Sequence, residues 1–574
     1  MLRKRSDMQS SMHLDQETPP IIRFKQGGRR RIVIEGTTVL SRGILNLLIR
    51  DIQGVKYLGN DTYEGPAAPR WVEYLTTVHK GKVVLDPQVQ QWHNAILDEE
   101  QHLIDAKGVD PGILPTLDGI EAWCNLKPFQ KQAVYFLLVG RHTILGDEPG
   151  LGKTLTALVA SQADPSRRKR VLIICPSSLK EWWAQEAQGW LNLSSTVATQ
   201  GIYTGQLRNY LKGNHTDLFI LNYELMLRLP ELQSVHWDWV IADEAHRVKN
   251  PTADTTRAFN RIKGAYSTLL TATPLANQPA ELWTLLNYSR PKETPAYGFF
   301  RSFYQKEYIT PSGWPKPAGP KNRELLKREH APVMIRRLKS EVGLQLPPKR
   351  HQRMPVWLLP EQVRAYRQMV HDLITELEDG TFVLGQEPAV AMLRLRQIAS
   401  NLATIGGADV SGKLDACMDL ITDQPEEPLV FFTVFRETAK ALHKRCLSAK
   451  PKIPAVLFIG EQTKEEDTKA IKSFTSGKAR VFIATIQKGG VGLNLQRAST
   501  LVFIDKHWNP ALQAQAEDRI HRIGQEKPCL ILSLHHKHTI DDYVERMLDK
   551  KISWNSSIIN LELPIHLEDS LRYL

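Results

Sequence analysis

The sequence is poor in cysteine and lacks long hydrophobic runs. Its 574 residues include only five cysteines, none of them in a CxxC pair. This spacing favours neither a disulfide framework nor a zinc knuckle, and it indicates a reducing, intracellular compartment. No stretch approaches the roughly 18 consecutive apolar residues that a membrane-spanning helix needs, and no apolar run follows the basic N-terminus. We therefore expect neither secretion nor membrane insertion.

The sequence also lacks fixed-period repeats and low-complexity tracts, which argues against a solenoid. Its hydrophobic share of 42% and charged share of 24% are those of a soluble globular protein. The length suggests roughly three to five compact units. The 74 Lys and Arg outnumber the 62 Asp and Glu, which gives a net charge of +12. This excess favours a polyanionic partner such as nucleic acid, although a basic surface without such a partner explains the charge equally well.

Changes in composition divide the chain into five segments. Residues 1–20 are polar, end in two prolines and predict a flexible tail. Residues 21–115 predict a small accessory domain. Two larger segments, 116–350 and 351–554, predict one lobe each, and residues 555–574 form a second tail.

The pattern within these segments predicts an α/β fold. Short apolar runs are each followed by Gly, Pro or Asp and then by a helical period, as in buried parallel strands with crossover helices. Strands of the first lobe are expected at 142–145, 170–175, 239–242 and 269–270. Strands of the second lobe are expected at 429–432, 455–459, 480–484, 501–504 and 530–534. The accessory domain should hold a strand at 31–35 and a helix near 45–52, and the Pro/Gly-rich residues 311–320 should form a loop or hinge.

A phosphate-binding loop is predicted at GDEPGLGKT, which follows the strand at 142–145 and precedes a helical run. Gly150 and Gly152 let backbone N–H groups turn toward phosphates, Lys153 supplies a charge, and the Thr154 hydroxyl can ligate magnesium. The strict GxxxxGK[ST] pattern is not met, because Asp147 occupies its first position. A chance match is the alternative reading of this loop.

Two adjacent carboxylates end the apolar strand that follows this loop. Asp243 can hold a magnesium ion between phosphates, and Glu244 can orient and deprotonate the attacking water. The C-terminal edge of a parallel sheet is where ligands of α/β proteins bind. A solvated acidic pair is the alternative, but delivery by an apolar strand after a phosphate loop argues against it.

Two arginines near the end of the second lobe could neutralise charge on a transferring phosphoryl group. Arg519 and Arg522 are three residues apart and share a face if their segment is helical. An exposed basic face is the alternative. An arginine supplied across a domain gap contributes ~10³–10⁵ in rate, and supply from a second lobe would make hydrolysis conditional on closure.

With these residues in view, the chain resembles the SWI/SNF-related family of helicase superfamily 2 from about residue 126 to residue 551. The matching segments, in chain order, are LKPFQ (126–130), GDEPGLGKT (146–154), CPSSLKEWWAQE (175–186), DEAH (243–246), TATPLANQPAELW (271–283), MIRRLKSEVGLQLPPK (334–349), ATIQKGGVGLNLQRA (484–498), DKHWNP (505–510) and QAQAEDRIHRIGQ (513–525). The resemblance implies two RecA-like lobes with helical protrusions. It also implies ATP and Mg²⁺ as cofactors and movement along double-stranded or forked DNA.

Roles for single residues follow from the same resemblance. Gln130 would lie near adenine, Lys153 and Thr154 at the phosphates and magnesium, and Asp243 and Glu244 would act in catalysis. Arg519 and Arg522 would be arginine fingers, and Gln513 and His521 would help close the site. The residues implied to contact DNA are Ser177, Ser178, Thr433, Thr485, Lys488, Gly489 and Trp508.

The forms QPAELW and VMIRRLKSEV are most similar to the annealing-helicase branch of this family. The accessory domain would then serve in fork recognition, for which WVEYL (71–75) and the basic strand at 29–35 give weak support. A domain that only packs on the first lobe is the alternative. Two departures from the family pattern are Pro149, where Met is common, and FFTVF (431–435), which matches motif IV loosely.

These features predict an ATP-dependent DNA translocase that acts in repair, fork remodelling or strand annealing. The runner-up is a superfamily 2 helicase acting on RNA or single-stranded DNA, and a third possibility is a catalytically silent DNA-binding scaffold. We expect a monomer of prokaryotic or phage type that works in the cytoplasm, at the nucleoid or in a phage-infected bacterial cell, rather than in a nucleus. The sequence indicates no particular protein partner.

Overall fold

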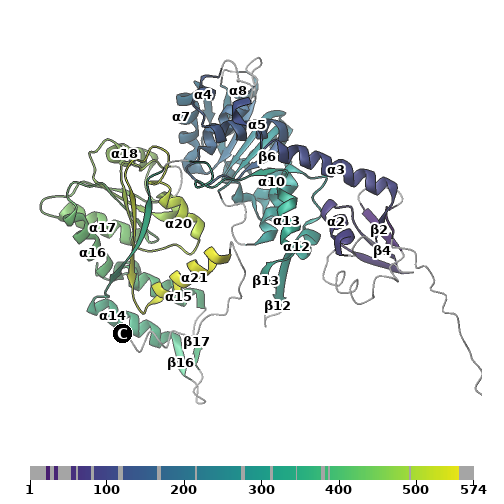
Figure 1. The fold of residues 1–574 in the computed structure, drawn as a ribbon. Helices are drawn as coiled ribbons and strands as arrows, with labels where there is room; N and C mark the ends of the chain where they lie inside the picture. Colours follow the sequence, from purple (N-terminus) through teal and green to yellow (C-terminus); the bar gives the residue numbers. More distant parts are fainter. Residues whose placement is uncertain are drawn as a thin grey trace, which may run out of the picture. The chain divides into compact units, whose positions relative to one another are not determined.

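The computed structural model of the chain describes residues 21–25, 31–35, 54–59, 62–78, 83–113, 120–163, 170–213, 216–272, 278–309, 315–343, 346–376, 382–384, 388–489 and 493–554. The chain forms two compact units, one of residues 1–106 with 278–333 and one of residues 107–277 with 334–574. Figure 1 shows their helices and strands, coloured along the sequence. No helix of the described residues is long and apolar enough to cross a membrane. The predicted tails and the helix expected near 45–52 lie outside the described residues.

The second unit contains the first of two parallel sheets, which forms the first lobe. Its strand order is β14-β6-β11-β10-β7-β9-β8, and every neighbouring pair is parallel. One inner strand, β7, is the uninterrupted apolar run VLIIC and is buried along its length, as a strand covered on both faces must be. The strands are β6 (His142–Leu145), β7 (Val171–Cys175), β8 (Ser195–Val197), β9 (Leu218–Asn222), β10 (Trp237–Asp243), β11 (Gly264–Leu270) and β14 (Met334–Ile335). The helices are α4 (Glu121–Asn125), α5 (Pro128–Gly140), α6 (Lys153–Ser161), α7 (Lys180–Leu191), α8 (Tyr203–Leu211), α9 (Tyr223–Met226) and α10 (Asp254–Arg261).

A second parallel sheet, with the order β15-β22-β21-β18-β20-β19, forms the second lobe in the same unit. Its strands are β15 (Lys349–Val356), β18 (Leu429–Thr433), β19 (Ala455–Phe458), β20 (Val481–Thr485), β21 (Thr500–Phe503) and β22 (Cys529–His536). Its helices are α14 (Pro360–Leu373), α15 (Pro388–Ser400), α16 (Gly412–Asp423), α17 (Arg436–Ser448), α18 (Lys464–Thr475), α19 (Ile486–Gly489), α20 (Pro510–Glu517) and α21 (Ile540–Trp554), with a hairpin of β16 (Ile374–Glu376) and β17 (Phe382–Leu384).

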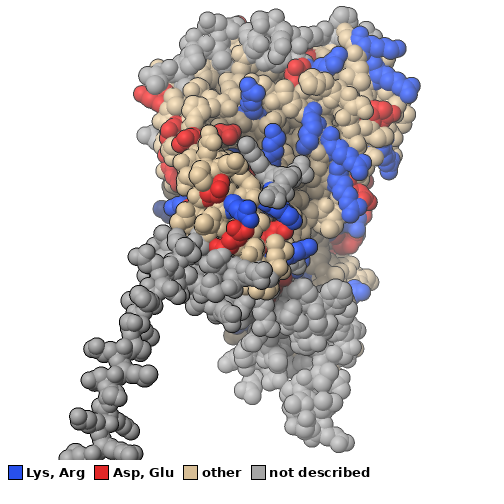
Figure 2. Space-filling model, turned by 90° about the vertical axis from the view of Figure 1, so that its right-hand side faces the viewer, with Lys and Arg blue, Asp and Glu red and all other residues tan. Residues whose placement is uncertain are grey.

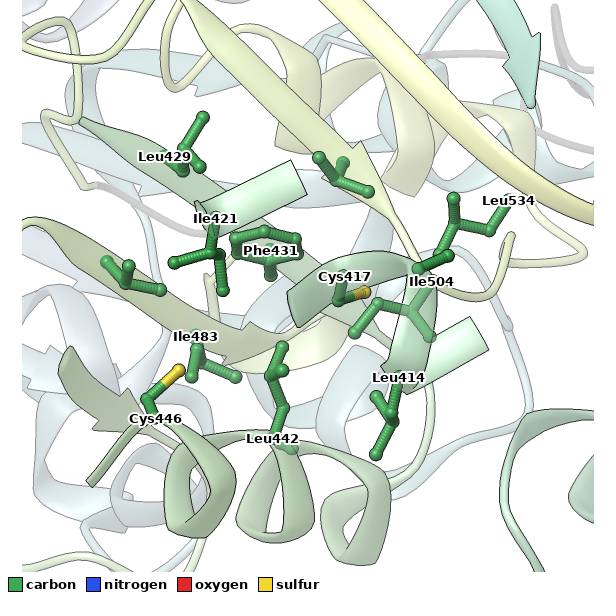
Figure 3. Packing of buried hydrophobic residues seen from close by; sticks show 14 of the residues in the cluster. Leu414, Cys417, Ile421, Leu429, Phe431, Leu442, Cys446, Ile483, Ile504 and Leu534 are labelled. Atoms are coloured by element: carbon green, nitrogen blue, oxygen red, sulfur yellow. The ribbon is translucent and has the colours of Figure 1, made fainter. Parts of the chain in front are cut away.

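Alternation along β18 shows how this second sheet divides the core. Leu429 and Phe431 face one cluster of buried side chains, whereas Val430 and Phe432 face another. Figure 3 shows the first cluster, in which Leu414 and Leu442 come from the covering helices α16 and α17. Because both faces of the strand are covered, its sequence reads LVFF without a polar alternation. Separate from this sheet, α14, α15 and α21 pack around the buried side chains of Tyr366, Val370, Leu395, Ile398 and Ile540.

The first unit is built around a five-stranded sheet of order β3-β4-β2-β1-β5, which is antiparallel except for the pair β1–β5. Its elements are β1 (Ile21–Phe24), β2 (Arg31–Glu35), β3 (Lys56–Gly59), β4 (Thr62–Pro66), α2 (Pro69–Val78), β5 (Val84–Leu85) and α3 (Pro87–Asp105). Residues 278–333 add α11 (Leu282–Ser289), α12 (Tyr297–Tyr304), the hairpin of β12 (Gln305–Ile309) and β13 (Pro315–Pro320), and α13 (Arg323–His330).

Helix α2 joins the two parts of the first unit through aromatic and charged contacts. The indole of Trp71 meets Phe299 and Phe303 edge-on, with ring centroids 5.6 and 5.7 Å apart. Next to it, the buried guanidinium of Arg70 pairs with Glu100 of α3 and lies 3.8 Å from Glu329 of α13. The N-terminal strands and residues 278–333 therefore share one core.

The structure confirms most of the predicted strands. The strands at 31–35 and 142–145 end at the predicted residues, and the strand expected at 269–270 is the last part of β11. The prediction of a loop throughout 311–320 is wrong, because residues 315–320 form β13. Proline is tolerated there because β13 pairs with a single strand and needs few ladder hydrogen bonds. The predicted domain limits stay predictions; β15, which pairs in the second sheet, begins at Lys349.

Candidate active site

A cavity of about 380 Å³ lies at the C-terminal edge of the first sheet, within the second unit. The first lobe contributes residues that follow β6, β7 and β10, whose C-terminal ends meet there because the strands are parallel. The second lobe contributes residues of α20 and of the turns after it. Among the lining residues are Gln130, Gly150, Gly152, Lys153, Thr154, Asp243, Glu244, Gln515, Asp518, Arg519 and Arg522.

Two glycines shape the loop between β6 and α6. Gly150 and Gly152 have φ angles of 86° and 79°, in the left-handed region that other residues rarely adopt. A Cβ added at Gly152 would lie 2.3 Å from Nε2 of Gln130, so a side chain there would displace the Gln130 amide as well as strain the backbone. Gly152 is also the N-cap of α6. The first N–H groups of α6 thus lie beside the cavity, where a helix N-terminus favours an anion.

Lys153, the first residue of α6, lines the cavity directly beside these glycines. Its Nζ donates hydrogen bonds to the carbonyl oxygens of Asp147 and Glu148, at 2.6 and 3.2 Å. Burial lowers the pKa of Lys153, and the nearby carboxylates of Asp147 and Glu244 oppose that shift. The side chain of Thr154 lines the same wall.

The loop before Lys153 is braced by the segment that follows β14. The guanidinium of Arg337 pairs with the Asp147 carboxylate, and its Nε donates to Oδ1 at 3.0 Å. The backbone N–H of Lys339 donates to Glu148 Oε2 at 2.7 Å. Sequence reasoning missed these partners, since a pairing between distant segments leaves no local pattern.

Strand β10 ends at Asp243 and delivers both predicted carboxylates to the cavity. Glu244 follows with a φ of 51°, a left-handed conformation that turns the chain sharply into a short 3-10 helix. Oδ1 of Asp243 accepts a hydrogen bond from the Glu244 N–H, and Oδ2 accepts one from the indole of Trp183, both at 2.9 Å. Burial, together with the neighbouring charge of Glu244, raises the pKa of Asp243 to about 6.

Glu244 has partners from both lobes. His246 Nδ1 lies 3.1 Å from its Oε2, and Gln515 Nε2 of α20 donates to its Oε1 at 3.3 Å. Burial acts to raise the pKa of Glu244, but the His246 imidazole and the charges of Lys153 and Arg519 outweigh it and lower that pKa. The two carboxylates therefore differ in proton affinity, as expected of groups with different roles.

The two arginines line the cavity, although not as residues of one helix. Helix α20 ends at Glu517, and Arg519 and Arg522 lie in the turns that follow it, so the helical arrangement considered for them does not occur. The chain turns there because the Arg519 carbonyl accepts from Leu495 N–H rather than continuing the helix. Burial and the charge of Arg522 lower the pKa of Arg519 to about 10, which leaves it protonated at neutral pH.

Of the three remaining residues predicted at the nucleotide, Gln130 lines the cavity, whereas Gln513 and His521 do not. Gln130 lines it, but its amide already accepts from Lys127 N–H and donates to the Leu151 carbonyl, at 2.9 and 3.0 Å. Gln515, rather than Gln513, is among the lining residues. His521 is also outside the lining, and its Nε2 lies 2.9 Å from the Pro347 carbonyl.

Three further lining residues, Trp182, Glu186 and Trp190, come from one face of α7. The Trp190 indole donates to Glu186 at 3.0 Å. Their spacing of four residues places them one helical turn apart, a signal that sequence reasoning could have used. Trp182 and Trp190 thus add flat apolar rings to the cavity lining, of the kind on which nucleotide bases stack.

The residues implied to contact DNA differ in exposure. Ser177 and Ser178, in the 3-10 helix before α7, are exposed. Thr433 is buried, and its hydroxyl donates to Asp505 at 2.6 Å. The others are Thr485, which is buried; Lys488, whose Nζ donates to Asp467 at 2.5 Å; Gly489, where a Cβ would meet Phe432; and Trp508, which stacks on Arg396. Their contact with DNA stays a prediction.

The residues around the cavity fit ATP and Mg²⁺. Among the described residues no three His, Cys, Asp or Glu side chains gather into a metal site. Mg²⁺ in nucleotide sites needs no such cluster, because one or two protein oxygens suffice when phosphates supply the rest. Thr154 and Asp243, which line the cavity, have side-chain oxygens that could serve as these ligands, and the glycine-lined helix start beside Lys153 is suited to phosphates.

Family models match the sequence over most of both lobes. The SNF2-related domain matches residues 129–403, and the helicase conserved C-terminal domain matches residues 412–524. The chain belongs to the SNF2-related helicase-like ATPases. Every predicted residue that lines the cavity falls inside these two matches.

Curated relatives of this family cover about three quarters of the chain. The ATP-dependent helicase/translocase YwqA of Bacillus subtilis is 29% identical over 463 residues, which are 76% of this chain and 49% of that protein. The SWI/SNF-related matrix-associated actin-dependent regulator of chromatin subfamily A-like protein 1 of Xenopus tropicalis is 31% identical over 435 residues, 75% and 44% of the two chains. The chain thus spans less than half the length of either relative.

Among solved structures, the SWI2/SNF2 ATPase core of Sulfolobus solfataricus in complex with double-stranded DNA is similar to this chain. The two are 25% identical, and the match covers 75% of this chain and 92% of that one at a TM-score of 0.37.

Proposed function

We propose that this SNF2-related ATPase is a DNA translocase that hydrolyses ATP to ADP and phosphate while moving on double-stranded or forked DNA. One observation carries the proposal. A single cavity brings together Lys153, Asp243 and Glu244 of the first lobe with Arg519 and Arg522 of the second. Groups of both lobes are needed for that constellation, so nucleotide turnover can be coupled to their relative movement.

In the proposed reaction, Lys153 and the amides at the start of α6 bind the phosphates. Thr154 and Asp243 would hold Mg²⁺, which would supply positive charge that stabilises the phosphates. Glu244 orients the attacking water and takes its proton, and its lowered pKa keeps it ionised for this task. Arg519 and Arg522 neutralise charge that develops on the transferred group.

DNA as the track is supported by family membership and by charge. The SNF2-related family includes proteins described as ATP-dependent helicases and translocases. The chain carries a net charge of +12, and Figure 2 shows a face on which Lys and Arg outnumber Asp and Glu. Of the proposed contacts, Ser177 and Ser178 are exposed at the end of β7 and have hydroxyls suited to phosphates.

A role in repair, fork remodelling or annealing is a finer proposal. It rests on the resemblance to the annealing-helicase branch and on the accessory strands of the first unit. Because residues 21–105 share a core with residues 278–333, packing alone already accounts for that domain. Fork recognition therefore needs its own test, and bacterial cytoplasm remains the proposed site of action.

ATP turnover measured without nucleic acid and with duplex, forked, single-stranded DNA or RNA tests the proposal. Duplex or forked DNA should stimulate most, because a motor that grips phosphates reads strand geometry rather than base edges. Greater stimulation by RNA or single strands would favour a helicase of another substrate class. No turnover with any of them would favour a DNA-binding scaffold.

A further inference from the structure

Two buried aromatic side chains that do not line the cavity donate hydrogen bonds to Asp243. Trp183 of α7 donates its indole N–H to Oδ2 of Asp243 at 2.9 Å. Tyr223, the first residue of α9, donates its hydroxyl to the main-chain carbonyl of Asp243 at 2.7 Å. Their exposed fractions are 0% and 2%, so neither lines the cavity itself.

The sheet order explains why these three residues meet. Strand β10 lies beside β7, and β7 lies beside β9. The register pairs Ala242 with Ile174 and Ile174 with Leu221, so all three strands end at one level. The connections that follow β7 and β9 carry Trp183 and Tyr223, and both reach sideways to the residue that ends β10.

These contacts restrict the Asp243 carboxylate at both oxygens. The Glu244 N–H occupies one lone pair of Oδ1, and the indole N–H occupies one lone pair of Oδ2. A carboxylate with one N–H donor on each oxygen has little freedom to rotate about its Cβ–Cγ bond. The remaining lone pairs then keep one direction, and Tyr223 fixes the backbone from which the side chain projects.

We propose that Trp183 and Tyr223 are positioning residues that set the plane and place of the Asp243 carboxylate for magnesium–nucleotide binding. This inference rests on the proposed function, in which Asp243 holds Mg²⁺. Partners that hydrogen-bond to a metal ligand commonly contribute 10–100-fold to metal affinity. Trp183 and Tyr223 act through Asp243 and touch neither metal nor nucleotide.

Substitutions Trp183→Phe and Tyr223→Phe test the inference. Tyr223→Phe removes only the hydroxyl donor, whereas Trp183→Phe removes the indole N–H and leaves a smaller aromatic ring. The measurement is binding of a fluorescent ADP, with and without Mg²⁺. The affinity without Mg²⁺ should stay within about twofold of wild type. The gain in affinity on adding Mg²⁺ should fall about tenfold for Trp183→Phe and less for Tyr223→Phe, which holds only the backbone.

Trp239→Phe is the matched control. Trp239 lies in the same strand as Asp243, is equally buried, and donates its indole N–H to Thr268 Oγ1 at 3.0 Å. Trp239→Phe should lower the melting temperature about as much as Trp183→Phe does. It should leave the gain in ADP affinity on adding Mg²⁺ unchanged.

The inference is overturned if both test variants keep the wild-type gain in ADP affinity on adding Mg²⁺, or if Trp239→Phe loses as much of that gain as they do. Should Trp183→Phe fail to fold, Tyr223→Phe decides alone, because it removes a single hydroxyl. Wild-type protein that binds no magnesium–ADP would instead refute the proposed function.

Discussion

Replacing Arg519 by alanine tests whether this side chain stabilises the transition state of hydrolysis or mainly supports the fold. The guanidinium lies in the cavity with Glu244, and its Nε donates to the Gln515 carbonyl at 2.9 Å. Losing that hydrogen bond should cost about 1 kcal/mol of stability. Under the proposed function the charge itself has a larger task, because it would neutralise negative charge that develops on the transferred phosphoryl group.

The expected loss of rate is much larger than the loss of stability. An arginine finger contributes ~10³–10⁵ in rate, which corresponds to ~4–7 kcal/mol of barrier. Arg519 has a pKa lowered to about 10 and is still charged at pH 7.5, so the whole of this contribution is available. Arg519→Lys keeps the charge but not the planar fork, and it should restore only part of the rate.

The assay combines steady-state ATP turnover on duplex DNA with separate binding measurements for nucleotide and DNA. Turnover of Arg519→Ala should fall by orders of magnitude, whereas both binding constants and the melting temperature change little. If the variant instead lost DNA affinity and kept its rate per bound complex, these arginines would belong to a DNA surface and the proposed mechanism would be wrong.

The other predictions concern Lys153 and Glu244 of the proposed active site and two residues of the first unit. Lys153→Ala and Glu244→Gln should both abolish ATP turnover, but only Lys153→Ala should weaken ATP binding markedly. Near-normal hydrolysis by Glu244→Gln would show that Glu244 is not the base. Burial raises the pKa of Glu329 from 4.5 to about 7, so the stability present below pH 4.5 should be lost as the pH rises through 7. In thermal melts Glu329→Gln should remove this loss of roughly 3 kcal/mol, and an unchanged pH profile would contradict the assignment. Trp71→Ala should lower the free energy of unfolding of the first unit by about 3–5 kcal/mol in denaturant melts, because the side chain is buried. As a control, Tyr57→Ala should lower it little, because Tyr57 is 58% exposed. Equal losses of stability would contradict the shared core.

The strands that could be predicted from the sequence with accurate bounds are those made of uninterrupted apolar residues. VLIIC and LVFF are buried on both faces and were placed to within a residue. The first five residues of β11 were missed because GAYST mixes small, aromatic and polar side chains. Strand β15, KRHQRMPV, was missed because it lies at a sheet edge and is largely exposed, so its sequence is charged.

The chemistry of the candidate site was predictable where motif and fold coincide. Lys153 begins the helix that follows β6, Asp243 ends β10 and Glu244 comes next, so their neighbourhood follows from the parallel sheet alone. The choice of Gln515 over Gln513 depends on how α20 is rotated toward Glu244, which no local pattern reveals. The pairing of Arg337 with Asp147 depends on β14 adding to the first sheet beside β6, and a two-residue strand leaves no periodicity to read.

The residues that line the cavity are divided between the two lobes, so opening of the lobes would separate some of them and leave others together. Lys153, Thr154 and Asp243 all belong to the first lobe and would stay together if the lobes parted. Glu244 would lose Gln515, and the cavity would lose both arginines. Under the proposed function, opening therefore leaves the nucleotide-binding groups assembled and disassembles those that serve hydrolysis. On that proposal the protein would hold ATP while it steps, and it would cleave ATP only when contacts with DNA favour the closed arrangement.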